Sequence, residues 1–351
     1  MRTSLWICIA ILAMLAFSTP LPAQIDWDAN GGTGGDLSNP LNWDGDQLPL
    51  LIDLARIDSN TSSGSPAFLA SDIFEIDNID LGSTTASYLA VNGGHLMVYG
   101  TQEIDFKIGV GATAQSAFTL SSGLVEFGEA GFYTDSNDFD VGKNGNGMYV
   151  QTGGTFKHHA DDFKIADSAG GTGMVDVSGG SLWVADGFSI SDNAGGTGTM
   201  NLSGNAEVVA GNSDGLGGFL GTLAGGYISI ANGGGTGSLN ITDNASMYGR
   251  YIEYRGEPGA SAIVTVGGDG KLIISEEMIT LTPGTGSAQN TLGWEEGTTG
   301  QIIVQESGMF AVDNPTEQPY SDGYVIGRTG GSGSLSVAGT NARVVVRQRI
   351  L

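Results

Sequence analysis

A short pattern of glycine and alternating apolar residues recurs along this chain, and it constrains the fold more than any other feature of the sequence. The pattern is G-x-h-x-h-x-G-G, where h is an apolar residue, and it is complete from Gly173 to Gly180. Related copies start at Gly198, Gly237 and Gly333, and an early copy starts at Ser87. Such self-similarity indicates a repeat protein, whose units must stack because none can bury its apolar face alone.

Each repeat predicts three short strands in a unit of about 25 residues. A second apolar alternation follows the glycine pair, at Leu182 and Val184, and a third short strand precedes the pattern, at Phe163 and Ile165. Alternation places one set of side chains on one face of each strand. The glycine- and asparagine-rich loops between the strands suit tight turns that need a left-handed backbone.

We therefore predict an all-β chain that forms a single-stranded parallel β-helix, a right-handed, pectin-lyase-like solenoid of about ten coils. Its interior would hold ladders of apolar residues from successive coils, such as Val175, Met200 and Leu239. The next residue of each copy would face outward, namely Asp176, Asn201 and Asn240. A β-sandwich or an array of hairpins is the main alternative, because closely spaced short strands suit those folds too. Recurrence of the whole three-strand unit favours the parallel β-helix over these alternatives.

Three stretches depart from the pattern. Gln151 stands where an apolar residue should point inward, so either the register slips there or the glutamine is buried with a partner. Residues 211–226 predict an extra loop between two coils, and residues 275–300 are irregular enough to break a coil.

The ends of the repeat region differ from its middle. Residues 24–60 lack the pattern and predict an N-terminal cap over the repeats of residues 61–351, because exposed strand edges invite pairing with other chains. The apolar cover of this cap would come from Trp27, Trp43, Leu48 and Leu50. At the other end Leu351 follows a coil directly, which leaves two expectations: a truncated reading frame, or a partner that covers the last coil.

Residues 1–23 have the features of a secretory signal peptide. Arg2 supplies the positive charge, Leu5–Phe17 forms the apolar run, and Leu21-Pro22-Ala23 precedes a cleavage site before Gln24. The run is too short for a comfortable transmembrane helix. We expect export to the periplasm, the cell surface or the extracellular space. The single cysteine, Cys8, lies in this segment, so the mature chain would contain neither a disulfide nor a cysteine metal site.

Composition narrows the classes of partner. The chain has 351 residues, of which 59 are glycine and 40% are hydrophobic, and its formal net charge is −25. This hydrophobic content excludes a disordered chain. The negative charge repels nucleic acid phosphates and anionic membranes, so we expect no nucleic-acid partner. A second long apolar run is absent from the sequence, so we expect no transmembrane span after cleavage.

The chain resembles a group of exported bacterial proteins. The residues that carry the resemblance are Ile25-Asp26-Trp27, Asn42-Trp43 and Asp53-Leu54-Ala55-Arg56-Ile57, together with the glycine-rich repeats. They are similar to exported repeat proteins of planctomycetes, which resemble autotransporter-passenger-like β-helices and often carry a PEP-CTERM-type sorting tail. We expect neither that tail nor a C-terminal barrel here, so surface anchoring is not carried over from the resemblance. The resemblance implies architecture and assigns no catalytic residue.

Two polar clusters are candidate sites. Asp135, Asn137, Asp138 and Asp140 form an acidic, calcium-like loop, although the glycine and terminal glutamate of an EF-hand are missing. His158, His159, Asp161 and Asp162 combine residue types that bind metals or move protons. A solvated turn or loop is the favoured explanation of either cluster, and in the histidine-containing cluster adjacent residues of a strand would point to opposite faces. The metal candidates are therefore Asp135, Asp138, Asp140, His158 and Asp162, with calcium as the only cofactor considered.

The functional expectation follows from this poor catalytic inventory. A nucleophile elbow and a phosphate-binding loop are absent from the sequence, so we name no catalytic residue and lean against an enzyme. We expect an exported β-helix with a surface, adhesive or matrix role, whose partners would be extracellular glycans or cell-surface components. The alternative is a β-helix that binds or cleaves polysaccharide, which would be favoured if His158, Asp162 and an outward Trp183 or Tyr248 shared one groove. A truncated fragment without function is a third possibility.

Overall fold

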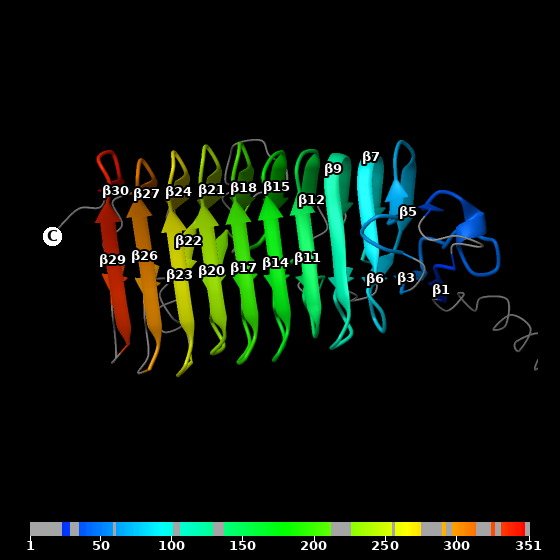
Figure 1. Cartoon of the computed structure of the whole chain (residues 1–351), viewed down its shortest axis with the longest axis horizontal. Helices are drawn as coiled ribbons and strands as arrows, with labels where there is room; N and C mark the ends of the chain where they lie inside the picture. The colour runs from blue at the N-terminus through cyan, green and yellow to red at the C-terminus, as the bar shows by residue number, and fades with distance from the viewer. Residues whose placement is uncertain are drawn as a thin grey trace, which may run out of the picture.

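The computed structural model confirms the predicted all-β, parallel β-helix fold. It describes residues 23–28, 35–58, 61–100, 106–128, 137–211, 226–254, 257–274, 290–292, 297–313, 324–326 and 331–347. The coils stack along one axis from the blue N-terminal end to the red C-terminal end (Figure 1). Within these ranges the only helical element is a short 3-10 turn, η1 (Pro40–Asn42). The predicted signal peptide lies outside the described residues up to position 22.

Three faces make up the tube, and the first face consists of short strands. These are β1 (Gln24–Asp26), β3 (Leu54–Ile57), β6 (Asn78–Leu81), β8 (Phe106–Ile108), β10 (Phe139–Val141), β13 (Phe163–Ile165), β16 (Phe188–Ile190), β19 (Tyr227–Ile230) and β22 (Tyr251–Glu253). Further along the chain, β25 (Asn290–Leu292) pairs with β28 (Tyr324–Ile326).

The second face holds the strands of the glycine pattern. They are β2 (Gly35–Asp36), β4 (Ala67–Leu69), β7 (Tyr88–Val98), β9 (Gln115–Phe127), β11 (Asn146–Gln151), β14 (Thr172–Val177), β17 (Thr197–Leu202), β20 (Thr236–Ile241), β23 (Ser261–Val266), β26 (Thr299–Gln305) and β29 (Ser332–Ala338). β7 and β9 continue into the third face.

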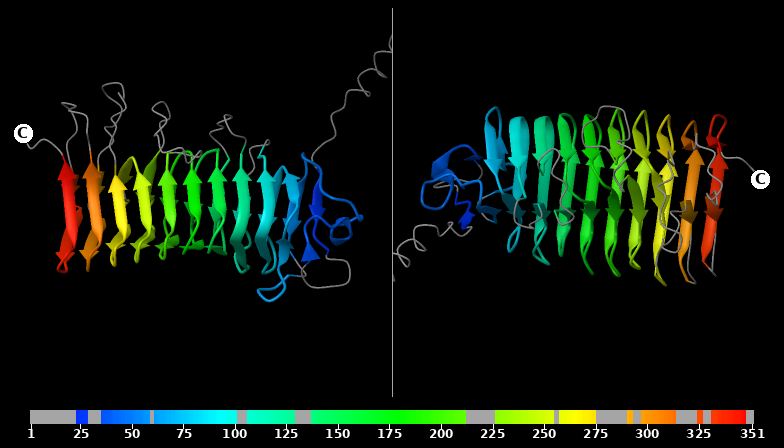
Figure 2. Two further views of the ribbon diagram at one scale, coloured as in Figure 1. Left: turned by 90° about the horizontal axis from the view of Figure 1, so that it is seen from above. Right: turned by 180° about the vertical axis from the view of Figure 1, so that it is seen from behind.

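The third face contains the second alternation of each unit. Besides the ends of β7 and β9, its strands are β5 (Ile73–Ile76), β12 (Thr155–His158), β15 (Ser181–Val184), β18 (Glu207–Ala210), β21 (Ser246–Gly249), β24 (Lys271–Ile274), β27 (Met309–Asp313) and β30 (Arg343–Arg347). The views from above and behind show the same stacking (Figure 2). Whether the coil is right-handed stays a prediction.

Parallel pairing in constant register builds the core. Val175 pairs with Met200, and Met200 pairs with Leu239, so the predicted interior ladder is confirmed. On the first face, Phe106, Phe139, Phe163 and Phe188 stack coil on coil, with ring centroids 4.8, 4.7 and 5.3 Å apart. Fully burying one such side chain contributes about 1.5–3 kcal/mol, so the ladders are a large part of what holds the coils together.

The predicted outward ladder is confirmed as well. Asn201 donates from Nδ2 to Oδ1 of Asp176 at 2.6 Å, and Asn240 donates in the same way to Asn201 at 2.9 Å. These residues lie on the opposite side of their strands from the apolar ladder, and each is partly exposed. Amide side chains at equivalent positions therefore link neighbouring coils from the outside.

Gln151 keeps the register and is fully buried, so the second of the two expectations for it is correct. It pairs with Leu120 on one side and Val177 on the other. Its Oε1 accepts a hydrogen bond from the hydroxyl of buried Tyr149 at 2.9 Å. Its Nε2 donates to the carbonyl of Ser181 at 3.0 Å. A polar residue is tolerated inside the tube because its amide is satisfied on both ends.

The N-terminal end is closed by tryptophan, and the prediction for two leucines is wrong. Trp27 and Trp43 are buried edge to face, with ring centroids 5.1 Å apart. Leu48 and Leu50, expected in the apolar cover, are 40% and 62% exposed. The carboxylate of buried Asp53 holds this loop in a turn, because its Oδ2 accepts a hydrogen bond from the backbone amide of Leu50 at 2.8 Å. This turn leaves both leucine side chains outside.

The insertion between β18 and β19 leaves the stacking unchanged. Residues 212–225 lie outside the described residues, so the predicted loop itself is not described. The strands on either side keep their register, since Phe188 pairs with Ile228 and Val208 with Met247. Among the described residues, the chain has no helix with the length and apolar character needed to cross a membrane.

Candidate functional site

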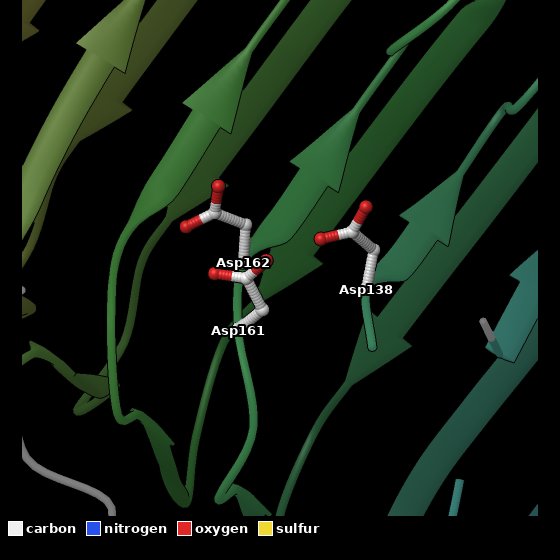
Figure 3. Close-up of side chains that lie close together, drawn as sticks. All are labelled: Asp138, Asp161 and Asp162. Carbon is white, nitrogen blue, oxygen red and sulfur yellow. The ribbon is translucent and has the colours of Figure 1, made fainter. Parts of the chain in front are cut away.

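Three carboxylates meet at the corner where the chain enters the first face. Asp138 directly precedes β10, and Asp161 and Asp162 directly precede β13. Because Phe139 pairs with Phe163, these residues occupy the same corner of two adjacent coils (Figure 3). One oxygen from each carboxylate lies within 4.8 Å of the others. We call Asp138, Asp161 and Asp162 the acidic corner.

The acidic corner joins residues from both predicted clusters: Asp138 from the calcium-like loop, and Asp161 and Asp162 from the histidine-containing cluster. Strand register brings them together, and no local motif contains both. The remaining metal candidates are elsewhere: Asp135 lies outside the described residues, and Asp140 and His158 occupy other environments, which are given below.

Lys164 is the counter-ion of the acidic corner. Its Nζ lies 2.6 Å from Oδ2 of Asp138, which is 8% exposed. Burial disfavours the charged form of Lys164, but the hydrogen bond and charge of Asp138, with the charges of Asp167 and Asp140, outweigh it. The pKa of Lys164 is therefore raised above its ordinary value, and the side chain remains a fixed ammonium group.

Tyr227 reaches the same corner from a later coil. Its hydroxyl donates a hydrogen bond to Oδ2 of Asp162, which lies 65 residues away in the sequence. Gly187 occupies the intervening coil, because Phe163 pairs with Phe188 and Phe188 pairs with Ile228. A Cβ at Gly187 would lie 2.6 Å from the Tyr227 ring. The missing side chain at Gly187 is what lets the phenol span one coil.

The carboxyl groups of Asp161 and Asp162 hold protons more tightly than free aspartates. Burial, followed by the negative charges of Asp138 and Asp186, raises the pKa of Asp161 to about 6. Burial also raises the pKa of Asp162 to about 7, although the hydrogen bond from Tyr227 opposes it. Near neutral pH the corner therefore contains carboxyl groups that gain and lose protons next to a fixed cation.

Asp140 belongs to a charge ladder on the outer side of the first face. Register aligns acidic and basic residues alternately through six strands, in the order Asp26, Arg56, Asp80, Lys107, Asp140 and Lys164. Arg56 contacts Asp26 at 2.7 Å. Asp140 is buried and lies 2.9 Å from Lys143. The apolar periodicity did not predict this ladder, although the charge at this position alternates in sign through these six strands.

His158 points into the core and does not join the acidic corner. Its ring stacks on Phe127, with centroids 4.8 Å apart, and Nε2 donates to the carbonyl of Asn137 at 3.2 Å. Burial lowers the pKa of His158 to about 3, with a small further lowering from His159 and an opposing hydrogen bond to Asn137. The imidazole is therefore neutral at physiological pH, and it is a structural residue of the interior.

A second polar cluster surrounds Glu126 on the third face. His95 lies 2.8 Å from Oε2 of Glu126, while His159 and Lys157 each lie 3.4 Å from Oε1. Burial alone would raise the pKa of Glu126. The hydrogen bond with His159 and the positive charges of Lys157 and His95 outweigh burial, so the pKa of Glu126 lies below its ordinary value. This carboxylate is a charged anchor that ties three coils together.

The carboxylate oxygens of the acidic corner suggest two kinds of chemistry, metal binding and proton transfer. Carboxylate oxygens are the ligands that calcium prefers, but calcium takes about 6–8 of them, and Lys164 already neutralises part of the charge here. A carboxyl group with a pKa near neutrality also suits proton transfer. His158 and Asp162, which the glycan hypothesis required in one groove, lie in the interior and at the corner respectively.

Comparisons with protein-family models, with curated proteins and with solved structures give no match to this chain. Function is therefore inferred from its residues and their arrangement.

Proposed function

We propose that this protein is an exported, non-enzymatic β-helix that serves as a surface, adhesive or matrix element. The observation that supports this proposal is the continuity of the tube: the described coils stack in register, and insertions leave the stack unchanged. A rod of this kind presents a long regular surface while each coil depends only on its neighbours. Two features of the sequence also support export. They are the apolar N-terminal segment before Gln24 and the resemblance to exported planctomycete-type repeat proteins.

Within this function the acidic corner fastens coils together. Lys164 and Tyr227 each engage one of its carboxylates from a different strand, so the cluster links β10, β13 and β19. The ion pair with Lys164 and the hydrogen bond from Tyr227 hold two of the three carboxylates in place. The corner is therefore assigned a structural role.

The experiment that tests the proposal combines fractionation with an activity screen. The full chain is expressed with its own N-terminal segment in a diderm bacterium, and the protein is located in cytoplasmic, periplasmic and medium fractions. We expect export with removal of the segment before Gln24. Purified protein is then incubated with neutral and acidic polysaccharides, and reducing ends and unsaturated products are measured. Retention in the cytoplasm, or turnover of any glycan, would refute the proposal.

A polysaccharide-cleaving β-helix is the second candidate, and one observation favours it. Asp162, with a pKa of about 7, could act as a proton donor at neutral pH. This candidate predicts that turnover on a glycan is lost in Asp162→Asn and retained in Glu257→Gln, which changes an exposed carboxylate outside the acidic corner. Absence of turnover in the unmodified protein would eliminate this second candidate.

A further inference from the structure

An apolar stripe runs along the outside of the third face, where alternation should place polar residues. Register aligns six outward positions of β15, β18, β21, β24, β27 and β30 in one line. We call this line the outer stripe, and its residues are Trp183, Val209, Tyr248, Ile273, Ala311 and Val345. Apart from Ala311, which is 8% exposed, each of these side chains is partly exposed.

The neighbouring positions make the stripe distinct. The parallel row two residues earlier on the same strands is mostly polar and carries both signs of charge, namely Ser181, Glu207, Ser246, Lys271, Met309 and Arg343. At the N-terminal end the line continues into Lys157 and Glu126. The ammonium of Lys157 lies 5.9 Å from the centre of the Trp183 ring. The surface is thus a narrow apolar track bordered by hydrogen-bonding groups.

The dimensions of the stripe decide what can occupy it. Six coils at about 4.8 Å spacing give a length of about 24 Å, and two residues along a strand give a width of about 7 Å. The resulting area is below about 200 Å², whereas a stable protein dimer needs about 800 Å² from each partner. A second copy of this chain is therefore a poor fit. A thin, extended polymer is a good one.

We propose that the outer stripe binds an uncharged polysaccharide chain that lies along the axis of the rod. Sugar rings present apolar faces that pack on aromatic and aliphatic side chains, and their hydroxyl edges suit the polar row beside the stripe. Trp183 and Tyr248 stand two coils apart, about 9.6 Å, so they can stack on two sugar rings of one chain. The net charge of −25 favours a neutral glycan over an anionic one.

This inference deepens the proposed adhesive role by naming its partner, and its test does not require export. Native electrophoresis of the full chain is run in gels that contain hydroxyethyl cellulose, laminarin or galactomannan, with carboxymethyl cellulose and gelatin as comparison polymers. We expect retardation in at least one neutral glycan, and little in the anionic glucan or the unfolded polypeptide. Trp183→Ala and Tyr248→Ala should each weaken the interaction about tenfold, because each removes one stacking surface.

Two controls keep the result interpretable. Trp183→Phe retains an aromatic ring and should keep most of the binding, while Ile263→Ala removes an exposed apolar side chain of the second face and should keep all of it. Thermal unfolding of each variant shows whether the fold is intact. The inference is overturned if no neutral glycan retards the protein, or if gelatin binds in preference. It is also overturned if Trp183→Ala lowers thermal stability while binding is unchanged, since the stripe would then pack against the protein itself. Detection of glycan turnover would refute the proposed non-enzymatic role, but it would not contradict glycan binding at the outer stripe.

Discussion

Tyr227 donates a hydrogen bond to Asp162 across a whole coil of the tube, and the ring passes over Gly187. The contact joins β19 to the start of β13, although neither strand pairs with the other. It depends on one missing side chain and on the register of three coils.

Gly187→Ala should displace Tyr227 and destabilise the protein. The new Cβ would lie 2.6 Å from the ring, so the phenol must move away from Asp162. We expect a loss of about 1–3 kcal/mol in the free energy of unfolding, as for other overpacked sites. Gly64→Ala is the matched control, because a Cβ there meets nothing within 4 Å. Equal stability of the two variants in chemical denaturation would contradict the proposed role of Gly187.

The acidic corner should make stability fall as pH rises. The folded pKa values of Asp161 and Asp162, about 6 and about 7, lie above the ordinary value of 3.8. The folded state therefore binds more protons than the unfolded state in this window. The stabilisation is complete below pH 4 and is lost as pH rises through 6 to 7. The charged and titratable groups that face the pair are Asp138, Asp186, Lys164 and Tyr227.

Other groups titrate with the opposite sign, so the measurement is a difference between proteins. The wild type and the double variant Asp161→Asn, Asp162→Asn are unfolded with urea at pH 4.5 and pH 8. We expect the wild type to lose about 2 kcal/mol more than the variant over this interval, which is less than the full pKa shifts would give because both carboxyl groups are partly exposed and solvent screens them. An equal pH dependence in both proteins would show that the pKa values of the two carboxyl groups are not raised.

Tyr149 and Gln151 should be energetically coupled. Gln151→Leu removes the acceptor of the buried Tyr149 hydroxyl, at a cost of about 1–3 kcal/mol. Tyr149→Phe in the same protein removes the orphaned hydroxyl and should recover part of this loss. A double-mutant cycle in urea measures the coupling, and strictly additive effects would show that the buried hydrogen bond contributes nothing.

His158 should stay neutral across the physiological range. Its folded pKa, about 3, is lowered mainly by burial, so the unfolded chain takes up a proton below pH 6.5 and the folded chain does not. This contribution to stability is complete above pH 6.5 and is lost as pH falls towards 3. His158→Phe, which keeps a ring to stack on Phe127, should weaken the acid sensitivity of unfolding. Imidazole NMR shifts of the wild type that titrate near pH 6.5 at His158 would contradict this assignment.

Much of the fold could be predicted because its information is local and repeated. Val175, Met200 and Leu239 occupy the same place in three copies of one pattern, so alternation alone indicates that they face inward. The leucines at 48 and 50 belong to no repeat, and their exposure depends on a single turn held by Asp53. Composition could not show that turn.

The sequence by itself determined the parallel tube, because each strand pairs with its own copy in the next coil and every coil repeats the same alternation. Only the tertiary structure decided which side chains meet at the corners and along the outside. The acidic corner, the span from Tyr227 to Asp162 and the outer stripe join residues from different coils, and their contacts depend on how the register continues past turns and insertions of unequal length. Neither periodicity nor composition contains that alignment, because it is a property of the stacked coils and not of any one of them.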